Sequence, residues 1–547
     1  MDITHIIDGL NDPQRAAVSA PLGNSLVVAG AGSGKTRVLV HRIAWLIEVE
    51  GVSPHSILAV TFTNKAAAEL RARTESLLNM SARSMWVGTF HSLAHRLLRM
   101  HWSEAKLPQN FQILDSDDQI RLLKRIMKTL DIDEKKWPAR QAAWFINGQK
   151  DEGRRAHQVP NGDDLFQITH KRIYQGYEEV CDQGGLVDFA ELLLRSHELW
   201  LNEPSLLQHY QQRFSHLLVD EFQDTNAIQY AWLRVLAGNQ SRIMAVGDDD
   251  QSIYGWRGAK IENIHNFSAH FADVQTIRLE QNYRSTKNIL DAANGLIQQN
   301  TDRLGKELWS AGGEGEPIKV YAGFNDLDEA RFIVERIEQW LESGGSADEV
   351  AVLYRSNAQS RVIEEALLRA NIAYQIYGGQ RFFERAEIKN ALAYMRLIED
   401  RHSDPAFERV VNTPPRGIGD KSIESIRQLA RSRQLSMWTA AKAGISEGVF
   451  PARVQKTVGA FIQLIDDLAE AVASMTLEEL AEHVVDVSGL MTFHSQERGE
   501  RGLARKENLQ ELVAACGQFA GDLVFPFEDS DRAEVSVLQE FLDQMTL

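Results

Sequence analysis

The sequence predicts an α/β fold built on a parallel sheet, with helices on both faces and two large helical insertions. Short apolar runs recur along the chain and each leads into polar residues, at Ser25–Ala29, Ile57–Thr61, Leu217–Val219 and Ile243–Val246. Runs of this kind are typical of buried parallel strands, whose carboxyl ends present functional side chains. A glycine loop and then a helical pattern of apolar residues follow the first run, which is how a βα unit begins.

The remaining segments divide the chain further. Between roughly residues 92 and 200 the strand signals vanish and helical spacing of apolar residues takes over, which predicts a helical insertion. From about residue 378 to the end the pattern is again helical. Between these regions a second alternation of strands and helices begins near residue 277, with strands expected at Thr276–Leu279, Ile318–Tyr321, Val350–Leu353 and Ala373–Ile376.

Composition excludes several classes of protein. A chain of 547 residues, 44% hydrophobic and 25% charged, has the length and composition of a folded multidomain protein. Its first residues do not resemble a leader, and no run is long enough to cross a bilayer, so we expect a cytoplasmic protein without a membrane partner. Two distant cysteines, Cys181 and Cys516, predict no disulfide framework and no structural metal. The net charge of −17 argues against coating nucleic acid by bulk electrostatics, but it leaves room for one local groove.

The glycine loop has the spacing of a P-loop. Small residues there let backbone N–H groups wrap phosphates, Lys35 would reach the β and γ oxygens, and Thr36 would place its hydroxyl on Mg²⁺. ATP and Mg²⁺ are therefore the expected cofactors. A glycine-rich turn that caps a helix without nucleotide is the alternative, and Lys-Thr in register between strand and helix argues against it. The expected phosphate-binding residues are Ala29, Gly30, Ala31, Gly32, Ser33, Gly34, Lys35 and Thr36.

An acidic pair ends the apolar run at 217–219. Asp220 is expected to hold Mg²⁺, and Glu221 to orient or deprotonate the attacking water. If these were only acids at a helix N-terminus, the helix dipole would explain one carboxylate but not the apolar strand before it.

Longer motifs carry a family resemblance. Asp220-Glu-Phe-Gln-Asp-Thr-Asn226 and Val246-Gly-Asp-Asp-Asp-Gln-Ser-Ile-Tyr-Gly-Trp-Arg-Gly-Ala259 resemble motifs II and III of the UvrD/Rep family of superfamily 1 DNA helicases. The other motifs of that family's N-terminal part have counterparts at Asn11–Val18, Thr61–Ala67, Gly88–Ser92 and Leu279–Ser285. The resemblance implies RecA-like lobes, with a first lobe at 1–91 and 200–280, a helical insertion at 92–199, the N-terminal part of a second lobe at 281–377 and an outer helical domain at 378–547.

The resemblance also implies roles at the nucleotide. Gln14 would read the adenine edge, Arg37 would lie beside base and ribose, and Tyr283 would stack on the ring. Gln251 would sense the γ-phosphate, and Arg284 would act as an arginine finger. The catalytic set implied in this way comprises Lys35, Asp220, Glu221, Gln251 and Arg284.

A track for single-stranded DNA is implied as well, in which aromatic rings stack on bases without sequence preference. Trp256, between glycines and beside an arginine, is poorly suited to a buried strand and is the strongest of these candidates. Arg416, Gly417 and Gly419 resemble a loop that binds duplex backbone, although a plain turn between helices explains them equally well. The residues expected on the single-strand track are Phe62, Asn64, His91, Tyr254, Trp256 and Arg257.

The family's motifs V and VI have no counterpart in the sequence, and Met491–Ser495 has only a superficial likeness to motif V. We therefore expect an incomplete second lobe that is weakly packed or prone to association, and a chain that lacks the C-terminal part of the family fold. On this interpretation nucleotide binding is retained, hydrolysis is reduced and unwinding is absent.

The function predicted for the parent protein is that of an ATP-dependent 3′ to 5′ DNA helicase of repair or replication. Its expected partners are single-stranded DNA, single/double-strand junctions, repair proteins or a second copy of the chain. The alternatives are a binding module that binds ATP and DNA without hydrolysing ATP, and the motor part of a helicase-nuclease. An RNA helicase is disfavoured, because Asp220-Glu-Phe-Gln-Asp224 resembles the DNA-directed branch.

Overall fold

In a computed structural model the protein is described for residues 3–82, 85–160, 162, 164–301, 303–376, 382–472, 474–497, 500–522 and 536–546. Its centre is a six-stranded sheet with the strand order β3-β2-β6-β7-β1-β8, in which every neighbouring pair is parallel. The predicted α/β class and the first four predicted strands are confirmed. The strands are β1 (Ser25–Ala29), β2 (Ile57–Thr61), β3 (Trp86–Thr89), β6 (His216–Val219), β7 (Arg242–Gly247) and β8 (Gln275–Leu279).

Alternate side chains of these strands enter two cores, because successive residues of a strand point to opposite faces. Val27 and Val246 pack in one core, and Leu26 and Ala245 in the other. The first core is covered by α1 (Thr4–Ile7), α2 (Asp12–Val18), α3 (Lys35–Glu48) and α4 (Asn64–Leu78). The second is covered by α5 (Phe90–Met100), α9 (Phe189–Asn202), α10 (Pro204–Arg213), α11 (Ala227–Ala237), α12 (Glu262–His265) and α13 (Phe267–His270).

The helical insertion has its own core. Apolar residues of its helices pack together, and the helices are α6 (Ser116–Thr129), α7 (Ala139–Asp151) and α8 (Leu165–Gly184). The region also contains a two-stranded parallel sheet of β4 (Gln112–Leu114) and β5 (Leu186–Asp188), two strands that the sequence analysis did not predict. Strands of three residues carry too little alternation to be recognised from the pattern alone.

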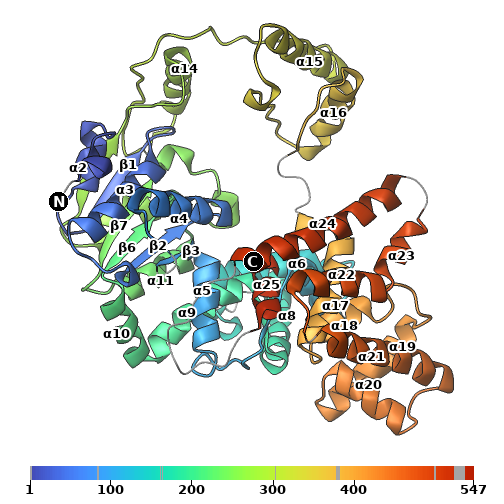
Figure 1. Cartoon of the computed structure of the whole chain (residues 1–547). Coiled ribbons are helices and arrows are strands. Elements are labelled where there is room, and N and C mark those ends of the chain that lie inside the picture. Colours follow the sequence, from blue (N-terminus) through green and yellow to red (C-terminus); the bar gives the residue numbers. More distant parts are fainter. Residues whose placement is uncertain are drawn as a thin grey trace.

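A third body of helices follows residue 382 and surrounds a separate apolar core (Figure 1). Tyr394, Phe407 and Phe461 are fully buried in it. The helices are α17 (Ala386–Glu399), α18 (Asp404–Val410), α19 (Asp420–Arg433), α20 (Met437–Ser446), α21 (Ala452–Val472), α22 (Leu477–Val487), α23 (Leu490–Ser495), α24 (Glu500–Asp522) and α25 (Val537–Thr546).

The segment between β8 and α17 differs from the prediction. It contains α14 (Lys287–Ile297), α15 (Asp326–Glu342) and α16 (Ser360–Arg369), and the last two pack on each other away from the sheet (Figure 1). Among the described residues 303–376 no strand forms at the predicted positions, and Val320 and Leu353 are 94% and 91% exposed. A strand needs a partner for its N–H and C=O groups, and these apolar runs have none here. The run at 276–279 instead forms β8, which pairs with β1 of the first sheet.

Within the part of the chain that the structure describes, none of the helices combines the length and the apolar character that crossing a bilayer requires.

Candidate nucleotide site and DNA groove

The P-loop follows β1 and is held against the segment after β8. Gly32 and Gly34 have φ values of 66° and 91°, a left-handed region that favours glycine. A Cβ at Gly32 would also collide with the side chains of Asn282 and Arg284. Asn282 donates a hydrogen bond from Nδ2 to the carbonyl of Ala31 at 2.6 Å. The sequence motif that contains Asn282 therefore shapes the loop directly, a role that the sequence analysis did not assign.

The residues predicted to contact the base surround the loop. Gln14 is buried and donates from Nε2 to the carbonyl of Ser33 at 2.8 Å. Tyr283 is 57% exposed, its N–H donates to Gly32, and its hydroxyl accepts from Asn11 at 2.8 Å. An exposed ring that is fixed at both its backbone and its hydroxyl offers a flat face to a planar ligand.

Three further predicted residues lie at the same mouth. Thr36 is in the first turn of α3 and is partly exposed, and Arg37 is exposed with its guanidinium beside Gly9. Arg284 is exposed, and its backbone N–H donates to Asn282. All of these side chains are accessible to a molecule bound on the loop.

The acidic pair at the end of β6 faces the P-loop lysine. Lys35 Nζ lies 2.7 Å from Glu221 Oε2. Burial, and secondly the charge of Glu221, raise the pKa of Asp220 to about 7. The same two causes raise the pKa of Asp224 to about 6, and Asp224 Oδ1 is buried without a hydrogen-bond partner among the described residues. Three carboxyl groups thus share one lysine, which leaves the cluster short of positive charge.

This shortage fits the predicted Mg²⁺ and ATP. Mg²⁺ takes oxygen ligands, usually one or two carboxylates together with substrate phosphates, and a hydroxyl and a carboxylate are available from Thr36 and Asp220. A cation there would stabilise the charged form of Asp220, which burial now disfavours. The loop's backbone and Lys35 are suited to phosphate oxygens.

A chain of hydrogen bonds leaves the acidic pair toward β7. Gln223 donates from Nε2 to Glu221 Oε2 at 2.9 Å and accepts from the backbone N–H of Asp248 at 2.9 Å. Asp248 in turn accepts from Gln251 Nε2 at 2.5 Å. The predicted γ-phosphate sensor, Gln251, is therefore joined to the predicted catalytic carboxylate through two side chains.

A second carboxylate cluster, Asp248 to Asp250, lies at the end of β7 and could by its geometry hold a metal ion. The ammonium of Lys306 occupies its centre, at 2.6, 2.7 and 2.8 Å from Asp248, Asp249 and Asp250. Arg303 adds two hydrogen bonds to Asp250, at 2.6 and 2.7 Å. Burial alone would lower the pKa of Lys306, but the three carboxylates raise it. The sequence analysis missed both cations, because nothing in their local pattern marks them.

Five of the predicted DNA residues line one groove, whose volume is about 1130 Å³, and Trp256 is not among the lining residues but contacts Arg257, which is. Phe62 and Tyr254 stack with their ring centroids 5.1 Å apart. The guanidinium of Arg257 lies over the rings of Tyr254 and Trp256, and Trp256 is 72% exposed. Exposed rings beside a cation are the groups that bind bases and backbone of a single strand. The predicted residues among those that line the groove are Phe62, Asn64, His91, Tyr254 and Arg257.

The groove also contains cations that the sequence analysis did not name. Lys65 is exposed in the first turn of α4, next to Asn64. The lining also includes Lys389, Arg396 and Arg409 from α17 and α18. These side chains lie more than 300 residues from Lys65 in the sequence, so only the fold brings them together.

Comparison with known proteins identifies the family. A model of the UvrD/REP helicase N-terminal domain matches residues 10–272, and a model of the UvrD-like helicase C-terminal domain matches residues 277–547. The chain belongs to the UvrD/REP helicase family. Membership confirms the predicted enzyme class, a DNA helicase and ATPase.

Individual relatives support the same family assignment. DNA helicase II of Escherichia coli (strain K12) is 58% identical over 547 residues, which cover 100% of this chain and 75% of that protein. DNA helicase II of Haemophilus influenzae is 55% identical over 551 residues, again 100% of this chain and 75% of that protein. The ATP-dependent DNA helicase PcrA of Staphylococcus epidermidis is 37% identical over 543 residues, 99% of this chain and 73% of the relative.

These matches correct one expectation. The C-terminal UvrD-like model extends to residue 547, so the prediction that this chain lacks the C-terminal part of the family fold is not supported. The prediction of deficient activity depended on it and is not supported either.

The loop at 412–419 has its own internal scaffold in this UvrD/REP family member. Asn412 Oδ1 accepts from the backbone N–H groups of Arg416 and Ile418. The guanidinium of Arg416 donates to the carbonyls of Val410 and Pro414 and to the hydroxyl of Tyr394. Arg416 therefore holds the loop from inside, while Gly417 and Gly419 are exposed. The backbone at the two glycines, rather than the arginine side chain, is what this loop presents.

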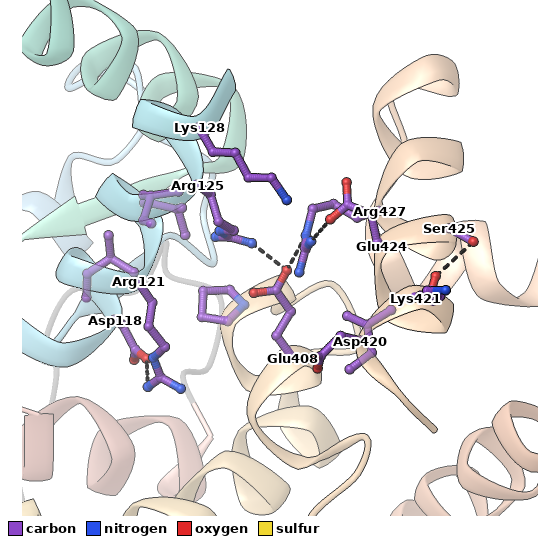
Figure 2. A pocket seen from close by; sticks show the side chains of 15 residues that line it. Asp118, Arg121, Arg125, Lys128, Glu408, Asp420, Lys421, Glu424, Ser425 and Arg427 are labelled. Carbon is purple, nitrogen blue, oxygen red and sulfur yellow. Dashed lines mark hydrogen bonds and ion pairs between the residues drawn. The ribbon is translucent and has the colours of Figure 1, made fainter. Parts of the chain in front are cut away.

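A charged hollow of about 700 Å³ lies between α6 and α19 (Figure 2). Glu408 bridges its two sides, because it pairs with Arg125 of α6 and with Arg427 of α19 at 2.9 Å. Arg121, Lys128 and Lys421 also line it. The insertion and the outer helices are thus joined by ion pairs around a cavity lined by charged residues of both signs.

Proposed function

We propose that this chain is an ATP-dependent DNA helicase that moves 3′ to 5′ along single-stranded DNA in DNA repair or replication. Membership of the UvrD/REP family supports the activity. Single/double-strand junctions are the proposed substrates, and the exposed glycines of the loop at 412–419 would lie on duplex backbone there.

One observation carries the proposal. Residues 248–257 form a single short segment that begins in the hydrogen-bonded network of the nucleotide site and ends in the DNA groove. Gln251 bonds to Asp248 at 2.5 Å, and three residues later Tyr254 stacks on Phe62. A change at the γ-phosphate that moves Gln251 would therefore also move Tyr254, three residues later, in the groove.

The proposed chemistry assigns a task to each residue. Thr36 and Asp220 would hold Mg²⁺, which neutralises charge on the phosphates when bound. Lys35 would turn from Glu221 to the β and γ oxygens, and this would free the carboxylate of Glu221 to orient the attacking water. Arg284 would approach the transferred phosphoryl group from the segment after β8.

The test is strand separation on partial duplexes that carry a single-stranded tail at either the 3′ or the 5′ end. The proposal expects unwinding in the presence of ATP and Mg²⁺ on the 3′-tailed substrate and little on the 5′-tailed one. A Lys35→Ala variant, which still has the DNA groove, is the matched control and should bind DNA without unwinding. Equal unwinding of both substrates, or unwinding that survives Lys35→Ala, would contradict the proposal.

A further inference from the structure

The contacts of Lys306 extend beyond the carboxylates that it neutralises. Its side chain is 1% exposed, and its ammonium bonds to Asp248 Oδ1 at 2.6 Å, while the other oxygen of Asp248 accepts from Gln251. The backbone N–H of Asp248 donates to Gln223, which bonds to Glu221. Lys306 thus fixes Asp248, whose carboxylate bonds to the predicted sensor Gln251 and whose backbone N–H is linked through Gln223 to Glu221.

The segment that carries Lys306 is itself held on two sides. Leu304 N–H donates to Asp249 Oδ2 at 2.7 Å, and Arg303 donates to the carbonyl of Lys306 at 3.0 Å. A few residues on, Leu308 lies against Gly30, where a Cβ would collide with it, and Trp309 pairs with the backbone at 280–282. The segment 303–309 therefore contacts both the P-loop and the turn at 248–251.

We propose that Lys306 is a positioning residue for ATP hydrolysis: it anchors the turn at Asp248–Gln251, and through it Gln223 and Glu221, to the segment 303–309. The expected effect on ATP turnover rests on the proposed function. The anchoring of the turn at Asp248–Gln251 does not, and it can be measured in an inactive protein.

Charge alone would not require this arrangement. Lys306 is buried, and its ammonium bonds to Oδ1 of Asp248, whereas Gln251 bonds to Oδ2 of the same carboxylate, so the lysine holds the group on which Gln251 rests. A compact ammonium that bonds three oxygens fixes their relative positions as well as their charge. A loosened turn would leave nucleotide binding at the P-loop intact and would misplace the groups that act on the γ-phosphate.

The experiment compares Lys306→Met, which keeps the side-chain length and removes the charge, with the double variant Lys306→Met/Asp249→Asn. The double variant restores the net charge of the cluster, and the amide oxygen at 249 can still accept from Leu304. Lys442→Met is the matched control, because Lys442 forms an exposed ion pair with Asp466 in the outer helices.

Two measurements are made on each variant. In ATP turnover with single-stranded DNA, both Lys306 variants should lose about 10- to 100-fold in kcat while KM for ATP changes little, since small misplacements of reacting groups cost rate rather than binding. In hydrogen exchange, which does not need activity, amides at 247–252 should exchange faster in both variants than in the wild type. Lys442→Met should match the wild type in both.

The outcomes separate the two proposals. Inactive wild-type protein together with faster exchange in both Lys306 variants would contradict the proposed function and support the anchoring role. Unchanged exchange in Lys306→Met would overturn the anchoring role, whatever the turnover. Recovery of kcat and of slow exchange in the double variant would show that Lys306 only neutralises charge, and would overturn the inference too. Should Lys306→Met fail to fold, the double variant alone decides between these results.

Discussion

The carboxylates after β6 and those after β7 lie at the same edge of one sheet, yet their negative charge is balanced to different extents. Asp220, Glu221 and Asp224 share a single lysine, and burial raises the pKa of Asp220 to about 7. Asp250, in the second cluster, has its pKa lowered, because hydrogen bonds from Arg303 and Lys306 outweigh burial. The first cluster is poised to accept a cation from outside, and the second already contains one from the chain. Carboxylates that gather near a phosphate loop are therefore not equivalent candidates for a metal site.

The largest effect is expected in the carboxylate cluster after β6. Glu221→Gln removes the proposed base but keeps the size of the side chain, and we expect ATP turnover to fall about 10²- to 10⁴-fold, the usual contribution of a general base. Binding of a fluorescent ATP analogue should remain, because Lys35 is unchanged. Phosphate release measured at saturating ATP checks this, and a loss smaller than tenfold would mean that Glu221 does not act on the water.

Stability should respond with opposite signs in the two clusters. In the folded, nucleotide-free protein the pKa of Asp220 is about 7, against an ordinary value of 3.8. The folded state therefore binds this proton more tightly than the unfolded state, and the protein loses stability as pH rises from 3.8 to about 7. Asp220→Asn removes this loss, and the gain should grow from pH 4 to 7 and approach about 4 kcal/mol above it, as an upper bound from 1.36 kcal/mol per pKa unit.

For Asp250 we predict the opposite effect on stability. Its lowered pKa means that it contributes stability above pH 3.8, which is lost only as pH falls through the lower folded value. Asp250→Asn should therefore destabilise the protein at neutral pH. Urea unfolding of both variants at pH 5 and pH 8 checks the pair, and effects of the same sign would refute the contrast between the clusters.

The DNA groove should show a smaller effect. Trp256→Ala removes an exposed ring that Arg257 supports, and we expect the affinity for single-stranded DNA to fall by about 1–3 kcal/mol, the usual contribution of one stacked base. Fluorescence anisotropy with labelled oligothymidine at fixed salt measures it. Trp144→Ala, at another exposed tryptophan, which lies on α7 of the helical insertion, is the matched control. An equal loss in both variants would show that Trp256 does not contact the DNA.

The smallest effect is expected far from either cluster. Val320 is 94% exposed in a run that has the composition of a strand but forms none. Val320→Thr should change stability by less than about 0.5 kcal/mol, as is usual for exposed sites. The same change at Val60, which is 1% exposed in β2, should cost considerably more. Thermal unfolding of both variants tests whether the run at 318–321 packs in solution.

How much could be predicted from the sequence depended on how local each signal is. Lys35 and Thr36 lie within one loop, and Asp220 with Glu221 ends one apolar run, so short-range spacing was enough to find them. Lys306 lies 56 to 58 residues from the carboxylates it contacts, and only the path of the chain after α14 brings it there. The three missed strand predictions have the same cause, because an apolar run becomes a strand only where another strand pairs with it.

The DNA groove was predictable in part for the same reason. Phe62, Tyr254 and Trp256 were found through motifs that resemble those of a known family, whereas Lys389 and Arg409 come from helices whose position no local pattern shows. The internal role of Arg416 was equally hidden, because its hydrogen-bond partners include Tyr394 and Ser488, distant in sequence.

The most direct test of the contrast between the two clusters is the Mg²⁺ dependence of nucleotide binding. Titration of a fluorescent ATP analogue with and without Mg²⁺ would compare wild type, Asp220→Asn and Asp249→Asn. We predict that Mg²⁺ strengthens binding in the wild type and in Asp249→Asn, and that this gain is lost in Asp220→Asn. Loss of the gain in Asp249→Asn, with Asp220→Asn unchanged, would place the cation in the cluster that Lys306 occupies and would contradict the account.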